Sequence, residues 1–304
     1  MANAVFTTKA EPVYDDLPER QYHFPRTYLN QASQAVGDFI VYYEPRRESA
    51  DLSGRSGRQA YFATARIARI VEDPKREGFF FAYVTDYLEF PKPVPFHIGE
   101  HYFESALKKG DGSTNKGAFG RSVRVLPASE YQAICSLGFA GTDLSGAAPF
   151  PDSSPIDATP RVEEDVPVYG RPSRTILLER PFRDAAFTRV IHSAYGATCA
   201  MTGLHLVNGG GRCEIEAAHI VPVEDNGPDS PRNGIALSRT VHWMFDRGIV
   251  SIADSGEILI ADRWMPDQIR GLLNPSGKIL PPSDPSMRPH PAFLLEHRKK
   301  FKGN

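Results

Sequence analysis

The stretch EAAHIVPVEDNGPDSPRNGIALSRTVHWMFDRG, residues 216–248, decides the fold of the C-terminal half of the chain. Its first residues, EAAHIVP, are mostly apolar and belong to a candidate β-strand over 211–221. A loop rich in Gly, Pro, Asn and Asp follows over 224–234, and a helix-like segment follows over 237–248. We therefore expect a strand and a helix that fold back on each other around a polar loop.

Two histidines and an asparagine occupy this predicted hairpin. His219 lies on the strand, Asn233 where the loop enters the helix, and His242 on the helix. Because the hairpin brings its two ends together, His219 and His242 are predicted to face one small volume. Hydrolysis of a phosphodiester needs a base that activates water and a cation that stabilises the leaving oxygen. A lone histidine in an apolar strand is more often a buried structural residue, so it is the spacing of all three that favours a catalytic site.

Together with YGATCAMTG (195–203), these residues resemble the HNH nuclease family over roughly residues 180–255. The resemblance implies a ββα-metal fold and cleavage of phosphodiester bonds. It also implies a role for each motif residue: His219 polarises the attacking water, Asn233 pins the loop, and His242 binds a metal ion. We expect that ion to be a divalent cation, Mg²⁺ or Mn²⁺.

The chain departs from the family pattern at the metal site. The family often has Asp or His directly before the general base, as a metal ligand, and this chain has Ala218 there. Glu216 lies on the same side of the predicted strand as position 218, so its longer side chain is one expected substitute. Asp246, one helical turn after His242, is the other, as a ligand or as a partner of one. Each carboxylate also has a simpler interpretation: Glu216 as a surface residue, and Asp246 as a partner of Arg247 or of solvent.

Cysteine usage argues against a structural zinc. Many HNH relatives carry two CxxC pairs, but Thr202 stands where the partner of Cys199 would be, and Ser238 and Val241 stand where the later pair would be. The chain has three cysteines, widely spaced, which is typical of reduced thiols. We therefore expect no structural zinc and a cytoplasmic location.

The N-terminal half has the pattern of a β-sheet. Residues 38–44, 59–73 and 78–90 are rich in β-branched and aromatic residues, and Gly and Pro cluster between them. Short strands broken by turns predict a small barrel or a half-open sheet rather than alternating strands and helices. Residues 1–20 are polar and contain Pro and Asp, and we expect a loose arm there.

Two segments of this half, FPRTYLNQASQAVGDFIVYYEPRR (24–47) and GRQAYFATARIARIVEDP (57–74), resemble the EVE branch of the PUA-like superfamily. The resemblance covers roughly residues 20–140 and implies a small β-barrel that holds a modified nucleobase, flipped into an aromatic pocket. A flipped base needs aromatic faces for stacking and polar groups for its Watson–Crick edge. The residues expected to supply them are Tyr22, Phe24, Tyr28, Asn30, Tyr43, Asp86 and Tyr87. The arginines expected to contact neighbouring phosphates are Arg46, Arg47, Arg55 and Arg58. The simpler interpretation of most of these aromatic residues is that they form the barrel core.

Composition divides the chain into four segments. After the arm, residues 21–140 form the expected EVE/PUA-like recognition domain. Residues 141–172 are dense in Pro, Gly, Ser and Asp and form the expected flexible linker. Residues 173–304 form the expected HNH domain with a C-terminal helix, and the fold class is α+β. No segment approaches the roughly 20 apolar residues that a membrane span needs, so no membrane partner is expected.

A base-reading module joined to a nuclease indicates a modification-dependent restriction endonuclease, similar to the type IV enzymes. We expect the N-terminal domain to flip a 5-modified cytosine in double-stranded DNA, and the HNH domain to cut nearby at a loose distance set by the linker. Cutting both strands requires two HNH domains, in a homodimer or in two molecules on one DNA. Two alternatives stay open. One is a nuclease of unmodified DNA or RNA; the other, because of Ala218, is a modified-DNA reader whose HNH domain does not cut.

Overall fold

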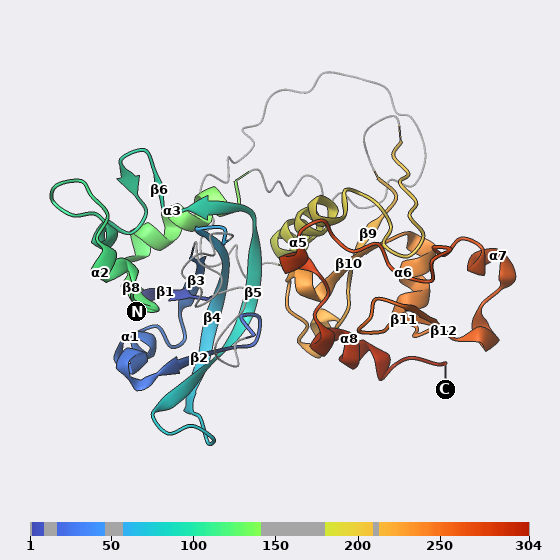
Figure 1. Cartoon of the computed structure of the whole chain (residues 1–304), viewed down its shortest axis with the longest axis horizontal. Helices are drawn as coiled ribbons and strands as arrows, with labels where there is room; N and C mark the ends of the chain where they lie inside the picture. Colours follow the sequence, from blue (N-terminus) through green and yellow to red (C-terminus); the bar gives the residue numbers. More distant parts are fainter. Residues whose placement is uncertain (1, 9–16, 46–56, 141–179, 209–212, 304) are drawn as a thin grey trace, which may run out of the picture.

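The computed structural model describes residues 2–8, 17–45, 57–140, 180–208 and 213–303. In these residues a six-stranded sheet occupies the N-terminal half, and two hairpins with their helices occupy the C-terminal half. Figure 1 shows the two halves side by side, with helix α5 (Arg180–Tyr195) at their boundary. The expected α+β class is confirmed. The predicted linker, 141–172, lies outside the described residues.

The N-terminal half contains eight strands and three α-helices among the described residues. They are β1 (Asn3–Thr7), β2 (Gln21–Pro25), α1 (Leu29–Gln34), β3 (Phe39–Glu44), β4 (Ala60–Glu72), β5 (Phe79–Pro95), β6 (His97–Ile98), β7 (His101–Tyr102), α2 (Lys116–Phe119), β8 (Val123–Leu126) and α3 (Ala128–Gly138). The predicted strands over 38–44, 59–73 and 78–90 correspond to β3, β4 and β5, and β5 extends further than predicted.

The sheet has the strand order β2-β5-β4-β3-β1-β8. β1 runs parallel to β3, and the other neighbouring strands are antiparallel. Register shifts interrupt the pairing of β4 with β5 and of β3 with β4. Such shifts bend a strand and increase its twist, and the sheet accordingly curls (Figure 1). Its outer strands, β2 and β8, are not paired with each other, so the described strands form an open sheet.

The N-terminus of the chain is part of this sheet. β1 lies between β3 and β8, and Ala4, Val5 and Phe6 have no exposed surface. The prediction of a loose arm over 1–20 is therefore wrong for residues 3–7. The short apolar segment is stabilised by burial between two strands that lie far from it in the sequence, although the composition of the whole arm is polar.

Helix α5 belongs to the cores of both halves. Phe182 and Ala186 pack in the cluster that lies under the sheet, where the ring centroids of Phe182 and Phe139 are 5.2 Å apart. Phe187 and Ile191 pack in the core of the C-terminal half. Because a helix buried from both sides cannot shift freely against either neighbour, α5 fixes the contact between the two halves.

The C-terminal half follows α5. Its elements are β9 (Glu216–His219), the 3-10 turn Pro231–Asn233, β10 (Gly234–Leu237), α6 (Arg239–Asp246), β11 (Val250–Ile252), β12 (Ile258–Ile260), α7 (Asp267–Arg270) and α8 (Pro291–Arg298). Three predicted helices, over 183–196, 237–248 and 290–301, correspond to α5, α6 and α8. No helix in the described part of the chain combines the length and the apolar character needed to cross a membrane.

The hairpin of β9 and β10 differs from the prediction in its strands. Among the described residues of the predicted strand 211–221, Glu216–His219 pair with β10, a strand that was not predicted. Gly234, the first residue of β10, lies directly under α5. A Cβ atom there would be 2.3 Å from Cδ1 of Ile191 and 2.8 Å from Cζ of Phe187. Glycine therefore allows α5 to approach the hairpin closely.

Candidate functional site

The predicted motif residues lie on the hairpin of β9 and β10 and on the helix α6 that follows it. β9 pairs antiparallel with β10, with His219 opposite Gly234 and Glu216 opposite Leu237. α6 begins two residues after β10 and packs against both strands. His219 therefore lies at the loop end of the hairpin, and Glu216 at the end near α6.

Asn233 is fully buried and joins the two ends of the polar loop. Its Oδ1 accepts a hydrogen bond from the Val221 N–H at 2.9 Å. Its Nδ2 donates to the carbonyl oxygens of Val221 and Pro228, each at 3.0 Å. These contacts hold the chain on both sides of the loop in a fixed register. Asn233 therefore has the surroundings of a positioning residue, and with no exposed surface it cannot touch a substrate.

Replacing Asn233 by alanine should lower the free energy of unfolding by about 2–4 kcal/mol, because a buried N–H and two buried carbonyls lose their partner. Urea unfolding followed by circular dichroism measures this. Glu224, exposed in the same loop, is the matched control, and its alanine variant should stay within about 0.5 kcal/mol of the parent. Equal stability of the two variants would show that Asn233 does not hold the loop.

His219 is oriented by a ring and a carboxylate. Its imidazole stacks on Phe187, with centroids 3.8 Å apart and planes 11° apart. Its Nε2 lies 2.8 Å from Oδ1 of Asp229. Its side chain is 14% exposed, and within the described residues its Nδ1 has no hydrogen-bond partner. One ring nitrogen is thus bound, and the other is left for a small molecule such as water.

Asp229 is a functional candidate that the sequence patterns did not indicate. Burial alone would raise its pKa, but the hydrogen bond with His219 and the positive charges of Arg183 and Arg180 outweigh burial, and the pKa of Asp229 is lowered. The carboxylate is therefore ionised, and it accepts a hydrogen bond from the N–H at Nε2 of His219. Its other oxygen, Oδ2, accepts from Arg183 Nε at 2.8 Å. Only the folded structure reveals this role, because Asp229 lies among other polar loop residues.

His242 lies between the two carboxylates named as substitute ligands. Its Nδ1 is 2.8 Å from Oε2 of Glu216, and its Nε2 is 3.5 Å from Oδ2 of Asp246. Glu216 also pairs with Arg239, whose Nε lies 3.2 Å from Oε1. No hydrogen bond, ion pair or ring contact joins His242 to His219 in the part of the chain described here. The two histidines therefore belong to separate groups, one at the end of β9 and one on α6.

The donors around His242 fit a divalent ion held by few protein ligands. If Nδ1–H donates to Glu216, the lone pair of Nε2 lies on the side of Asp246, and Glu216 fixes the ring. Mg²⁺ commonly keeps several waters and takes one or two carboxylates plus substrate phosphate. Among the described residues no three His, Cys, Asp or Glu side chains are grouped to enclose an ion. Ala218 is fully buried, so position 218 faces the core.

Comparison with known proteins identifies this part of the chain. The profile of the HNH endonuclease family matches residues 199–253, which include β9, β10 and α6. Residues 199–253 form an HNH endonuclease domain. The resemblance seen in the motif residues is thereby shown, and the domain's hairpin and helix are the elements that carry His219, Asn233 and His242.

Solved structures with a distant likeness also exist. The modification-dependent TagI restriction endonuclease is 12% identical, with a TM-score of 0.34 over 98% of this chain and 81% of that chain. The N-terminal domain of McrB from Staphylothermus marinus is 12% identical, with a TM-score of 0.29 over 43% and 92%. A protein from Agrobacterium tumefaciens is 14% identical, with a TM-score of 0.29 over 45% and 93%. A search of the curated proteins found no match.

Four of the aromatic residues predicted to hold a base lie in the hydrophobic core of the N-terminal half. Tyr22, Phe24, Tyr43 and Tyr87 are each at most 3% exposed. They pack against other rings, as in the contact of Tyr22 with Phe6 at 4.7 Å between centroids. Tyr22, Phe24 and Tyr87 belong to one apolar cluster of the sheet and Tyr43 to another. All four are core residues, and their part in a base pocket stays a prediction.

The other predicted recognition residues are accessible but dispersed. Tyr28 is half-buried and Asn30 is exposed, and both lie near the start of α1. Asp86 lies on β5 and accepts from Arg66 Nε at 2.8 Å. Within the described residues no hydrogen bond or ring contact links Asp86 to Tyr28 or Asn30. The structure therefore does not bring these three residues together.

The predicted phosphate contacts are described only in part. Arg46, Arg47 and Arg55 lie outside the described residues. Arg58 forms ion pairs with Glu44 and Glu89, which neutralise its charge. These ion pairs engage its guanidinium within the N-terminal half, and its contact to the DNA backbone stays a prediction.

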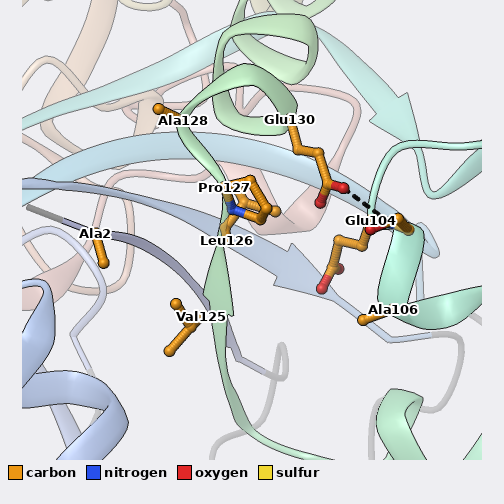
Figure 2. A pocket seen from close by; sticks show the side chains of 9 residues that line it. Ala2, Glu104, Ala106, Val125, Leu126, Pro127, Ala128 and Glu130 are labelled. Atoms are coloured by element: carbon orange, nitrogen blue, oxygen red, sulfur yellow. Dashed lines mark hydrogen bonds between the residues drawn. The ribbon is translucent and has the colours of Figure 1, made fainter.

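A hollow of about 350 Å³ lies beside β8 and the start of α3, and Figure 2 shows the side chains that line it. Its lining has no aromatic residue. Its two carboxylates are already engaged: Glu104 pairs with Arg124, and Glu130 accepts from the Ser105 N–H at 3.1 Å. Because a flipped base is held by stacking on rings, this hollow lacks the surface that a nucleobase requires.

Proposed function

We propose that the chain is a modification-dependent DNA endonuclease. Its HNH domain hydrolyses a phosphodiester bond, and the segment 21–140, a PUA-like domain of the EVE type, reads a 5-modified cytosine. The observation that carries the nuclease assignment is the state of His219, whose Nε2 is bound to an ionised Asp229 while its Nδ1 has no partner in the described structure. An imidazole in this state is ready to accept a proton.

The chemistry follows from that geometry. Nδ1 of His219 takes a proton from a water molecule as the water oxygen bonds to phosphorus and the ester bond from phosphorus to the leaving oxygen breaks. Asp229 stabilises the imidazolium that forms. Phe187 keeps the ring in plane during this transfer. Asn233 contributes by holding the loop that carries Asp229. His242 and Asp246 would hold a divalent ion, with Glu216 fixing the His242 ring, and its positive charge would stabilise the leaving oxygen.

The recognition half is proposed on the sequence pattern and on an accessible subset of the predicted residues. Tyr28 offers a partly exposed ring, and Asn30 and Asp86 offer polar groups. Arg46, Arg47 and Arg55 stay proposed contacts to phosphates. Extruding a base from the duplex costs a few kcal/mol, so the recognition half must recover that cost through stacking and hydrogen bonds to the flipped base.

Double-strand cleavage is proposed to take two copies of the chain. One HNH domain presents one general base, His219, and therefore hydrolyses one strand at a time. A homodimer, or two molecules on neighbouring marks, would place a second HNH domain on the other strand.

Incubation of the purified chain with Mg²⁺ or Mn²⁺ and three matched DNAs tests the proposal. The DNAs carry cytosine, 5-methylcytosine or 5-hydroxymethylcytosine at the same positions. We expect at least one modified DNA to be cut and the unmodified DNA to stay intact. Equal cutting of all three, or of an RNA, would make the chain a nuclease without modification dependence. Retained binding to modified DNA without cutting would make it a reader.

A further inference from the structure

The loop that carries Asp229 is held by the N-terminal half of the molecule. The backbone of Asp229 bridges to Leu88 of β5 in a parallel arrangement, and the Glu89 N–H points at the Asp229 carbonyl, 3.4 Å away. Ser230, fully buried, donates from its Oγ to Oε1 of Glu19 at 3.0 Å. Hydrogen bonds to β5 and to Glu19 therefore attach this loop of the HNH domain to the N-terminal half.

Arg183 ties the same loop to the same strand. Its Nη1 and Nη2 donate to the carbonyl oxygens of Asp86 and Tyr87 at 3.1 and 2.9 Å. Its Nε donates to Oδ2 of Asp229 at 2.8 Å. One guanidinium thus fixes the Asp229 carboxylate relative to β5. Since Oδ2 is taken by Arg183, the oxygen that remains for His219 is Oδ1.

We propose that Asp229 is a positioning residue that keeps the proton of His219 on Nε2. β5 and Arg183 hold Asp229 in the place that this role requires. The N-terminal half thereby completes the catalytic centre. The inference rests on the proposed role of His219 as the general base. A base that works through Nδ1 must have its proton on the other nitrogen. Asp229, ionised and accepting only, enforces this tautomer.

Two substitutions separate this role from a merely structural one. In Asp229→Asn the amide oxygen can still accept from Arg183, but the amide nitrogen then faces His219 and donates to Nε2, which places the ring proton on Nδ1. Asp229→Ala leaves His219 free to adopt either tautomer. We expect Asp229→Asn to lower kcat by about 10²–10⁴-fold with little change in KM, and Asp229→Ala to lower it by only about tenfold. A structural role predicts the opposite order, because alanine removes more contacts.

Nuclear magnetic resonance reads the tautomer without any cleavage. Two-bond ¹H–¹⁵N correlations of the imidazole rings distinguish a proton on Nε2 from one on Nδ1. We expect Nε2–H for His219 in the parent chain and Nδ1–H in Asp229→Asn, with the His219 signals assigned through a His219→Gln variant. The same tautomer in both proteins, or a kcat for Asp229→Ala as low as that for Asp229→Asn, would overturn the inference.

Arg183→Met tests the contribution of the N-terminal half in the full-length chain. Loss of the guanidinium releases the Asp229 carboxylate from β5, while the backbone bridge of Asp229 to Leu88 remains. We expect a mixture of His219 tautomers and a fall in kcat of about tenfold. Arg189, exposed on the same helix, is the control, and Arg189→Met should keep the parental tautomer. An unchanged tautomer in Arg183→Met would contradict the role of β5. A parent chain that cleaves no DNA would refute the proposed function, while the tautomer measurements would still decide the position of the proton.

Discussion

Replacing His219 by alanine should lower the single-turnover rate of DNA cleavage by about 10²–10⁴-fold, because general-base catalysis contributes about that much. The affinity for DNA should stay close to that of the parent. The reason is local: Nδ1 of His219 is the group proposed to take the proton of the attacking water. Asp229 is a poor replacement, because its pKa is lowered and its Oδ2 is bound by Arg183. Quenched-flow cleavage of labelled DNA, with enzyme in excess, measures the rate.

The choice of variants separates chemistry from packing. His219→Gln can still donate a hydrogen bond to Asp229 and cover Phe187, but it cannot accept a proton at the working pH. It should therefore be as slow as His219→Ala while unfolding at the parental temperature. His205, which is exposed, provides the matched control, and His205→Ala should cut at the parental rate. A His219→Gln variant within threefold of the parent would remove His219 from the mechanism.

The second large effect is expected at the proposed ion site. His242→Ala should reduce cleavage at every Mn²⁺ concentration, because it removes the nitrogen proposed to bind the ion. Glu216→Gln should act more mildly, since Glu216 contacts Nδ1 of His242 at 2.8 Å and fixes the ring. Changes to such orienting residues typically cost about 10–100-fold in metal affinity. The protein is first stripped of metal with a chelator, and cleavage rates are then measured across a Mn²⁺ titration. A loss at every concentration is expected for His242→Ala, and a shift to higher Mn²⁺ for Glu216→Gln.

A variant of Asp246 shows which carboxylate, Asp246 or Glu216, replaces the metal ligand that the family often has directly before the general base. If Asp246 is the second ligand, Asp246→Asn should need far more Mn²⁺ than Glu216→Gln for half-maximal cleavage. Asp267, exposed at the start of α7, is the control, and Asp267→Asn should leave the titration unchanged. The reverse order of Asp246→Asn and Glu216→Gln would assign Glu216 as the ligand instead.

The HNH half was the more predictable part because its site is local in sequence. His219, Asn233 and His242 lie within one hairpin and the helix that follows it, so their spacing alone indicated the family and the loop. β10 was missed because GIAL is short and follows a polar loop, and its pairing with β9 becomes visible only in the fold. Asp229 was missed for a related reason: its role depends on β5 and Arg183, which are distant in the sequence.

The N-terminal half shows where sequence patterns stop being informative. Its long strands were predictable from their composition, but aromatic residues occupy both faces of them. In β5, for example, Phe80 and Tyr87 are buried, whereas Tyr83 is half-exposed. When both faces are aromatic, alternation cannot separate core from binding surface, and four predicted pocket residues turned out to be core. β1 was missed because its burial depends on strands that lie far along the chain.

A competition experiment tests the central claim, that a modified cytosine directs the HNH domain. Two DNAs of equal length and sequence, one unmodified and one carrying 5-methylcytosine or 5-hydroxymethylcytosine, are labelled differently and cut in one tube by the full-length chain with Mn²⁺. The ratio of the two kcat/KM values is then independent of enzyme concentration and metal. We expect a ratio of about tenfold or more in favour of a modified DNA, because one methyl-sized group in a fitted pocket is worth about 10–200-fold. A ratio of one for both modifications would contradict it.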